Sequence, residues 1–296
     1  MRAELPRPSV RPVPYGRSRV DAGRVELTRL AAIVHARLTR GELRPRVLAG
    51  LDRLLPPPPL PDLRVRLTSD VGLRLDGDGA LARIALLCAG YEHRECEVLA
   101  GAVRPGAVFV DVGANVGWFS LMVAAHRPEA AVWAIEPLPE TAGVLRRNVR
   151  EAGLDSVAVH EVALGEADGA VEFVATADPA FAHARGLAAS RSESGRAVRA
   201  GTEVTTCPVT TLDRLWAAAG RPQVDAVKVD VEGAEPAVLA GAREMLAQCH
   251  PLLVVEAPTE PELRAVRGVL DPLGYVLAPR PGVLPYNVIF AKEDRA

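Results

Sequence analysis

V-F-V-D-V-G-A-N-V-G, residues 108 to 117, is the stretch that decides the fold of this chain. An apolar run reaches Asp111 and is followed by the small residues Gly113, Ala114 and Gly117. This pattern predicts a buried parallel strand that enters a helix through a tight glycine turn. In open α/β sheets such a turn presents backbone N–H groups at the carboxyl end of a strand, where ligands bind. The stretch therefore predicts a pocket for a nucleoside cofactor.

The spacing within this turn distinguishes between two kinds of cofactor. Dinucleotide-binding loops have the spacing G-x-G-x-x-G, which lets the backbone approach a pyrophosphate. Here the spacing is D-x-G-x-N-x-G, with Asp111 ahead of the first glycine and Asn115 between the two. A carboxylate repels a diphosphate and attracts a cation. S-adenosylmethionine carries a positive sulfonium, a positive amino group and no phosphate, so the loop favours this methyl donor over NAD.

Composition sets the class of protein. The 296 residues, 49% of them apolar, suffice for one large α/β domain with an N-terminal extension. The net charge of −2 gives no general attraction to nucleic acid or to an anionic membrane. We also find no signal peptide and no segment that could span a bilayer. Four cysteines, at 88, 96, 207 and 249, have no C-x-x-C spacing, which favours reduced thiols and a cytoplasmic protein.

The first 60 residues differ from the rest of the chain. Residues 1–20 are rich in Pro and Arg and have no apolar period, which is typical of an extended arm. Residues 25–55 have a helical period interrupted near Gly41, which predicts a helical hairpin, and such helices could pair two copies of the chain in a homodimer. We therefore divide the chain into an arm and hairpin over residues 1–60 and a cofactor-binding domain over residues 61–296.

The larger domain alternates strands and helices, which predicts an α/β fold with a parallel sheet covered on both faces. Its last two strands follow each other directly, as expected of an antiparallel pair. Before this core we expect a hairpin around residues 69–70 and a helical stretch over residues 80–103. Residues 170–210 interrupt the rhythm, and we favour a lid or substrate loop over the alternative of a passive insertion. The predicted strands are 107–111, 131–136, 157–163, 224–230, 252–256, 275–278 and 286–291, and the helices are 117–127, 139–152, 234–247 and 260–272.

Glu136 ends the second core strand, 25 residues after Asp111, in the sequence W-A-I-E-P that includes Pro137. An acid at the tip of this strand, beside the glycine turn, can accept hydrogen bonds from both ribose hydroxyls of an adenosyl cofactor. The alternative is a surface acid that precedes a turn proline. Because the strand tip and the glycine turn occur together, we favour the ribose interpretation.

A second cluster of charged residues is V-K-V-D-V-E-G-A-E, residues 227–235. The strand period places Lys228 and Asp230 on one face, and a lysine buried in such a strand needs a carboxylate partner. For Lys228 a structural ion pair is as good an interpretation as a functional one. Asp230 and Glu232 follow the ligand-facing end of the strand, and for them we favour a functional role. The candidate partners of the lysine are Asp230, Glu232, Glu235 and Glu256.

With these motifs the chain resembles FkbM-type S-adenosylmethionine-dependent methyltransferases. The resemblance covers roughly residues 80–291, and its most discriminating part is the block at 227–235. The first 55 residues fall outside it. The motifs that carry it are G-Y-E at 90–92, F-V-D-V-G-A-N-V-G-W-F-S at 109–120, A-I-E-P at 134–137, T-T-L-D at 210–213, V-K-V-D-V-E-G-A-E at 227–235 and P-L-L-V-V-E at 251–256.

The resemblance implies a class I methyltransferase fold, Rossmann-like, with a seven-stranded sheet whose last strand is antiparallel. It also implies O-methylation of a small molecule or sugar. Glu136 would bind the ribose, and the turn from Asp111 to Gly117 would line the methionine end. The implied cofactor-binding residues are Asp111, Gly113, Ala114, Asn115, Gly117, Glu136, Pro137, Asp230, and Tyr91 with Glu92, which would close over the pocket; the implied catalytic residues are Asp230, Glu232 and Lys228.

Methyl transfer to an alcohol requires that the acceptor be aligned and its proton removed. We hypothesise that Asp230 or Glu232 is the general base, with His93 and His250 as rival bases. The carboxylates could also hold a divalent ion, but the sequence has no His/Cys ligand pattern and Lys228 can neutralise the cluster, so we predict no metal.

Two other functions fit parts of the sequence. One is an NAD-linked oxidoreductase, which the glycine spacing disfavours. The other is a non-catalytic protein that keeps a cofactor pocket as a scaffold. The composition also fits a tailoring enzyme of secondary metabolism that acts on a small-molecule acceptor.

Overall fold

The structure is a computed structural model that describes residues 64–68, 70–75, 92–174, 183–185, 204–278, 283 and 285–292. The predicted arm and hairpin of residues 1–60 lie outside the described residues. So do Tyr91 and the part of the predicted helical stretch that precedes it.

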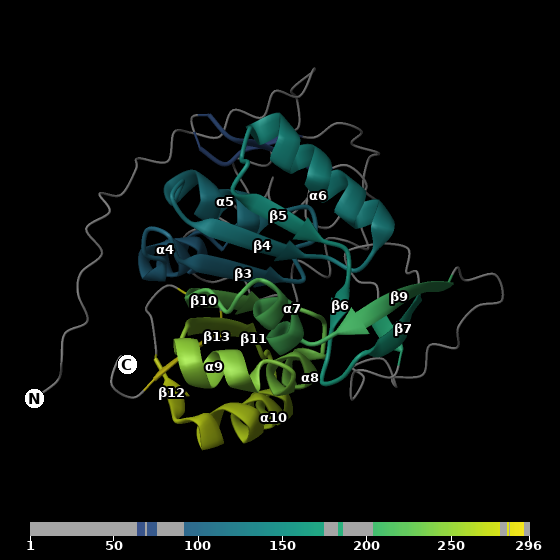
Figure 1. Cartoon of the computed structure of the whole chain (residues 1–296), viewed down its shortest axis with the longest axis vertical. Helices are drawn as coiled ribbons and strands as arrows, with labels where there is room; N and C mark the ends of the chain where they lie inside the picture. Colours follow the sequence, from purple (N-terminus) through teal and green to yellow (C-terminus); the bar gives the residue numbers. More distant parts are fainter. Residues whose placement is uncertain are drawn as a thin grey trace, which may run out of the picture.

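The centre of the fold is a seven-stranded sheet in the order β12-β13-β11-β10-β3-β4-β5 (Figure 1). The five strands from β11 to β5 are parallel, whereas β13 is antiparallel to both of its neighbours. This confirms the predicted α/β fold with an antiparallel last strand, and places that strand inside the edge strand β12. The strands are β3 Val108–Val112, β4 Ala131–Ile135, β5 Val157–His160, β10 Val224–Val229, β11 Leu252–Glu256, β12 Tyr275–Leu277 and β13 Asn287–Lys292.

Helices cover both faces of this sheet because its strands alternate two sets of buried side chains. Phe109 of β3 faces the helices α4 (His93–Ala102), α5 (Trp118–His126) and α6 (Pro139–Ala152). The next residue, Val110, faces the opposite way, and its side of the sheet is packed with valine and leucine. That second face is covered by α7 (Leu212–Ala218), α8 (Glu235–Ala240), α9 (Arg243–Cys249) and α10 (Glu260–Leu270), which is followed by a 3-10 turn, Asp271–Leu273.

Two predicted elements are divided in the structure. The helix predicted over residues 234–247 is two helices, α8 and α9, that meet at Gly241. A Cβ atom on Gly241 would lie 2.0 Å from the backbone oxygen of Gly165, so this close approach admits only glycine. The strand predicted over residues 157–163 stops at His160, because the chain then leaves the central sheet and forms β6 (Ala163–Leu164) beside β9.

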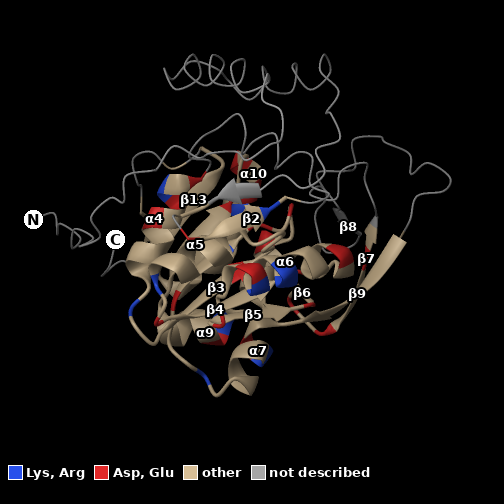
Figure 2. Ribbon diagram, turned by 90° about the horizontal axis from the view of Figure 1, so that it is seen from above, with Lys and Arg blue, Asp and Glu red and all other residues tan. Residues whose placement is uncertain are grey.

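The inserted segment forms a second, smaller sheet in the order β6-β9-β7-β8. Besides β6, its strands are β7 (Gly169–Val174), β8 (His183–Arg185) and β9 (Val204–Thr210). The small sheet lies beyond the carboxyl ends of β3, β4 and β5 (Figures 1 and 2). Residues 175–182 and 186–203 of the predicted lid lie outside the described residues.

A hairpin packs on α6. Its strands are β1 (Arg64–Arg66) and β2 (Gly72–Arg74), which pair antiparallel as predicted. Asn148 of α6, 1% exposed, accepts a hydrogen bond from the Arg74 N–H and donates to the carbonyls of Arg74 and Val116. One buried amide thus connects the hairpin, α6 and the turn that follows β3.

The surface carries mixed charge. Both acidic and basic residues lie along α6, whereas β3, β4 and β5 are almost entirely tan (Figure 2). The three described cysteines, Cys96, Cys207 and Cys249, are buried and free. In the part of the chain that is described, every helix is too short or too polar to cross a membrane.

Candidate functional site

The glycine turn after β3 is held in a conformation that requires small residues. The N–H groups of Gly113 and Ala114 both donate to the Ile135 carbonyl of β4, each at 3.0 Å. Gly113 has φ +80° and Gly117 has φ +103°, and Asn115 between them is also left-handed. A Cβ atom on Gly113 would lie only 1.8 Å from the backbone oxygen of Asp230. The turn and the end of β10 therefore pack backbone against backbone.

Asp111 lies just before this turn, on the face of β3 that α4, α5 and α6 cover. Its side chain is 1% exposed and accepts a hydrogen bond of 2.6 Å from the Ser120 hydroxyl of α5. Burial raises the pKa of Asp111 to about 6, and the bond from Ser120 opposes part of the rise. The sequence interpretation did not assign Ser120, although it lies within the motif at residues 109–120. The sequence feature that could have identified Ser120 is its position in the first turn of α5, the helix that follows the glycine turn.

Glu136 lies beside the turn at the end of β4 and is 6% exposed, so it is not a surface acid. Its two carboxylate oxygens accept hydrogen bonds from the N–H of Asn115 at 3.1 Å and from the N–H of Leu138 at 3.0 Å. Burial raises the pKa of Glu136 to about 7, although both bonds favour the charged form. The next residue, Pro137, accepts a hydrogen bond from the Cys207 thiol of β9 at its carbonyl. Glu136 thus joins the glycine turn to the start of α6.

Lys228 lies on β10, in register with Asp111 of β3 on one side and Val254 of β11 on the other, and it is fully buried. Its ammonium donates to an oxygen of Asp230 at 3.1 Å and to the Asn287 side-chain oxygen at 3.2 Å. It also lies 5.2 Å from the centre of the Phe119 ring. Burial lowers the pKa of Lys228, but Asp230 and Glu92 raise it more, so it ends above its ordinary value. The structure pairs the lysine with Asp230, as the shared face of the strand predicted.

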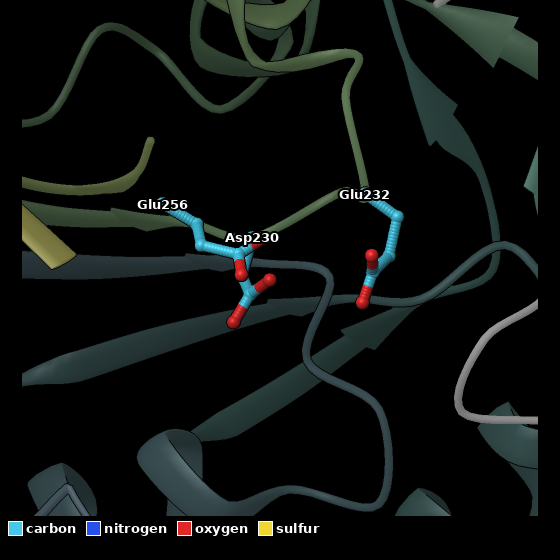
Figure 3. Close-up of side chains that lie close together, drawn as sticks. All are labelled: Asp230, Glu232 and Glu256. Carbon is cyan, nitrogen blue, oxygen red and sulfur yellow. The ribbon is translucent and has the colours of Figure 1, made fainter. Parts of the chain in front are cut away.

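Three carboxylates gather at the ends of β10 and β11. Asp230 and Glu256 lie side by side, and Glu232 extends from the turn after β10 toward the same side (Figure 3). Oxygens of all three lie within 4.8 Å of one another, and all three side chains are half-buried. Such oxygens suit a hard cation, but grouped acids are common at surfaces without one. The absence of a metal stays a prediction.

Glu92 reaches this edge from the start of α4. It is 4% exposed, has φ +47°, and accepts a hydrogen bond of 3.0 Å from the Asn287 side-chain amide. Burial raises the pKa of Glu92 to about 7, and Lys228 opposes the rise. The predicted partner Tyr91 lies outside the described residues.

Other candidate groups lie in different surroundings. Glu235 accepts hydrogen bonds from the backbone N–H groups of Val231 and Gly233, so it stabilises the turn before α8 rather than pairing with Lys228. His250 ends α9 just before β11 begins, which places it at the amino end of the parallel strands. His93 lies 3.1 Å from Glu97 of its own helix.

The site therefore brings together acids from β3, β4, β10 and α4 at the carboxyl end of a doubly wound sheet. Ligands bind at this end of open α/β sheets. The order of the strands, with reversed β13 between β11 and β12, and the acidic glycine turn after β3 together define a class I methyltransferase fold.

The family follows from comparison with known proteins. The chain belongs to the FkbM methyltransferase family, because the model of the Methyltransferase FkbM domain matches residues 111–277, more than half of the chain. Similar curated proteins include the AMB antimetabolite synthetase AmbE of Pseudomonas aeruginosa, 30% identical over 46% of this chain. Others are the 2-O-methyltransferase NoeI of Sinorhizobium fredii, 27% identical over 49%, and the 31-O-demethyl-FK506 methyltransferase FkbM of Streptomyces tacrolimicus, 37% identical over 31%.

The chain spans less than two thirds of each of these relatives: 8% of AmbE, 61% of NoeI and 39% of FkbM. Among solved structures, a methyltransferase FkbM from Methylobacillus flagellatus is 17% identical with a TM-score of 0.43, covering 72% of this chain and 52% of that one. M. jannaschii TYW2 in complex with AdoMet is 15% identical with a TM-score of 0.42, covering 78% of this chain and 83% of that one.

Proposed function

We propose that this chain uses S-adenosylmethionine to methylate a hydroxyl group of a small molecule or sugar in secondary metabolism. The observation that carries the proposal is a set of three buried acids at the carboxyl end of the sheet, Glu92, Asp111 and Glu136, each with its pKa raised by burial. Buried carboxylates without a matching cation are costly. A cationic ligand would offset that cost, whereas the pyrophosphate of NAD would increase it.

The hydrogen-bond acceptors of the site fit such a cofactor. Each oxygen of Glu136 accepts one backbone hydrogen bond, which leaves lone pairs on both oxygens for the two ribose hydroxyls. Asp111 and the turn that follows it, with Gly113, Ala114, Asn115 and Gly117, would hold the methionine end. Pro137 and Asp230 would border the same pocket.

When bound, S-adenosylmethionine supplies a methyl carbon that its sulfonium has already activated. The chain must then align the acceptor hydroxyl and accept its proton. Asp230 and Glu232 lie at the edge where the acceptor would bind, and either could act as the general base. Lys228 would act through Asp230, since its ammonium holds one oxygen of that carboxylate.

Methylation at oxygen is supported by the relatives. NoeI is described as a 2-O-methyltransferase, and the FkbM protein of Streptomyces tacrolimicus acts on 31-O-demethyl-FK506. The second of these names a small-molecule acceptor, which supports an acceptor of that class here.

Titration calorimetry with S-adenosylmethionine, its demethylated product and NAD tests the cofactor. We expect the first two to bind and NAD to give no heat; NAD binding alone would instead favour an oxidoreductase. Incubation with methyl-labelled donor and an extract of the producing organism tests catalysis. A compound that gains about 14 daltons, one methylene, identifies the acceptor. Binding of the donor without any labelled product would favour a non-catalytic scaffold.

A further inference from the structure

Asn287 is a buried residue of the site that no motif identified. It is the first residue of β13 and is 6% exposed. Because β13 runs opposite to its neighbours, its beginning lies where the parallel strands end, and Asn287 pairs in register with Glu256. It also lies beyond residues 111–277, which the family model matches. The reversal of the last strand therefore delivers this amide to the acidic edge of the sheet.

The Asn287 amide connects a buried cation to two buried acids. Its oxygen accepts from the Lys228 ammonium at 3.2 Å, and its nitrogen donates to Glu92 at 3.0 Å and to Glu95 at 3.3 Å. An amide has one acceptor oxygen and two N–H donors, so this arrangement uses all of them. Only one orientation of the amide satisfies both sides, because the oxygen must face the ammonium and the nitrogen the carboxylates.

A neutral group at this position has a particular effect on Lys228. A carboxylate in its place would compete with Asp230 for the ammonium. An amide binds the ammonium more weakly than a carboxylate does, since hydrogen bonds between two charged groups are the stronger ones. Asn287 thus fixes the position of the ammonium, and the ion pair between Lys228 and Asp230, at 3.1 Å, is left without a competing carboxylate at this position.

We propose that Asn287 is a positioning residue that fixes Lys228 beside Asp230 and Glu92 at the same edge of the pocket. This rests on the proposed function, because Asp230 is a candidate base of the proposed methyl transfer. Asn287 acts through its neighbours and contacts no reacting atom. The alternative is a purely structural tie between α4 and β13, which would stabilise the fold without affecting the charges of the site.

The test replaces Asn287 and follows the titration of Glu92 by NMR in protein with ¹³C-labelled glutamate. In the wild type, the pKa of Glu92 is raised to about 7 while the Asn287 bond opposes the rise. Asn287→Asp removes the donor and adds a negative charge, so the titration of Glu92 should move up by about 1 pH unit or more. Asn287→Leu removes the donor at similar volume and should move it up by less. If Glu92 titrates in both variants as in the wild type, the proposal is overturned.

Asn148→Asp is the matched control. Asn148 is also a buried asparagine that connects three segments, but its partners are backbone groups of Arg74 and Val116. This variant should unfold at a lower temperature while the Glu92 titration stays in place. If it moves the titration as far as Asn287→Asp does, loss of stability explains both shifts and the positioning role is refuted.

A kinetic measurement connects the network to methyl transfer. Once the acceptor has been identified, Asn287→Asp should lower kcat about 10- to 100-fold at pH 7 with a smaller change in the KM of the donor. The acid limb of its pH–kcat profile should move to higher pH, and Asn287→Leu should leave that limb closer to the wild type. Equal profiles would contradict the proposal. If the wild type neither binds the donor nor makes product, the proposed function fails, whereas the NMR result still decides the role of Asn287 in the network.

Discussion

The amino and carboxyl ends of the parallel strands carry acids in opposite electrostatic states. At the amino end, Asp225 is buried but accepts three hydrogen bonds from Arg104, one of them from its backbone N–H. Burial acts to raise the pKa of Asp225, but the bonds from Arg104 outweigh it and hold the pKa below its ordinary value. At the carboxyl end, burial prevails, and Asp111 and Glu136 have raised pKa values.

This difference separates structural acids from those of a binding site. Asp225 has a cation dedicated to it, so its burial is compensated within the chain. The acids at the carboxyl end share Lys228 and backbone N–H groups, and part of their charge is left for a ligand to balance. Groups whose pKa is perturbed by desolvation in a ligand-binding position are candidates for function. The comparison therefore predicts that substitutions at the carboxyl end change binding and turnover, and that those at the amino end change stability.

The largest effect is expected at the candidate base. Asp230→Asn keeps the shape of the side chain but cannot accept a proton as a carboxylate does, so kcat should fall about 10²- to 10⁴-fold. The donor should still bind with an affinity close to that of the wild type. Turnover measured with methyl-labelled donor, beside calorimetry, tests this. Glu232→Gln is the paired variant: if it abolishes turnover and Asp230→Asn does not, Glu232 is the base.

The next effect is expected at the contact between the glycine turn and β10. Gly113→Ala would place a Cβ atom against the Asp230 carbonyl and would also require φ +80° of a non-glycine residue. The turn must therefore shift, and donor affinity should fall roughly 100-fold, about 3 kcal/mol. Gly106→Ala is the control, since Gly106 has φ +77° but open space around it at the amino end. It should cost about 1 kcal/mol of stability and leave donor affinity unchanged. Equal losses of affinity in the two variants would contradict a role for the contact.

A smaller effect is expected from pH. The acids at the carboxyl end have pKa values of about 6 for Asp111 and about 7 for Glu92 and Glu136. A cationic ligand favours their ionised forms, so donor affinity should rise as pH increases from 5.5 to 8, by up to about tenfold per pH unit for each proton released. Calorimetry in two buffers of different ionisation enthalpy measures that release. An affinity that is flat across this range, with no proton release, would show that the acids do not contact the cation.

The sequence pattern predicted most residues of the site at the carboxyl end of the sheet, because these residues follow the period of their own strands. Asp111, Glu136 and Asp230 could be placed together from the rule that parallel strands end at one edge. Asn287 could not, because its role depends on a strand reversal and on a contact with Glu92, 195 positions away. The break at Gly241 was missed for a similar reason, since helical periodicity continues through it and only the approach of another backbone segment requires it. Local sequence patterns therefore predict the fold, whereas the contacts between distant segments that complete the site cannot be predicted from them.

The smallest expected effect on function is at the amino end. Asp225→Asn should lower the free energy of unfolding by about 1–3 kcal/mol at pH 7, because the Arg104 bonds to a charged acceptor weaken. Since the folded pKa of Asp225 is lowered, its contribution is present above the ordinary value of 3.8 and is lost as the pH falls through the folded value. In urea unfolding, the stabilities of the wild type and the variant should therefore begin to converge only as the pH falls below 3.8. Donor affinity should be the same in both, and a loss of affinity in Asp225→Asn would mean that the amino and carboxyl ends of the parallel strands are coupled rather than separate.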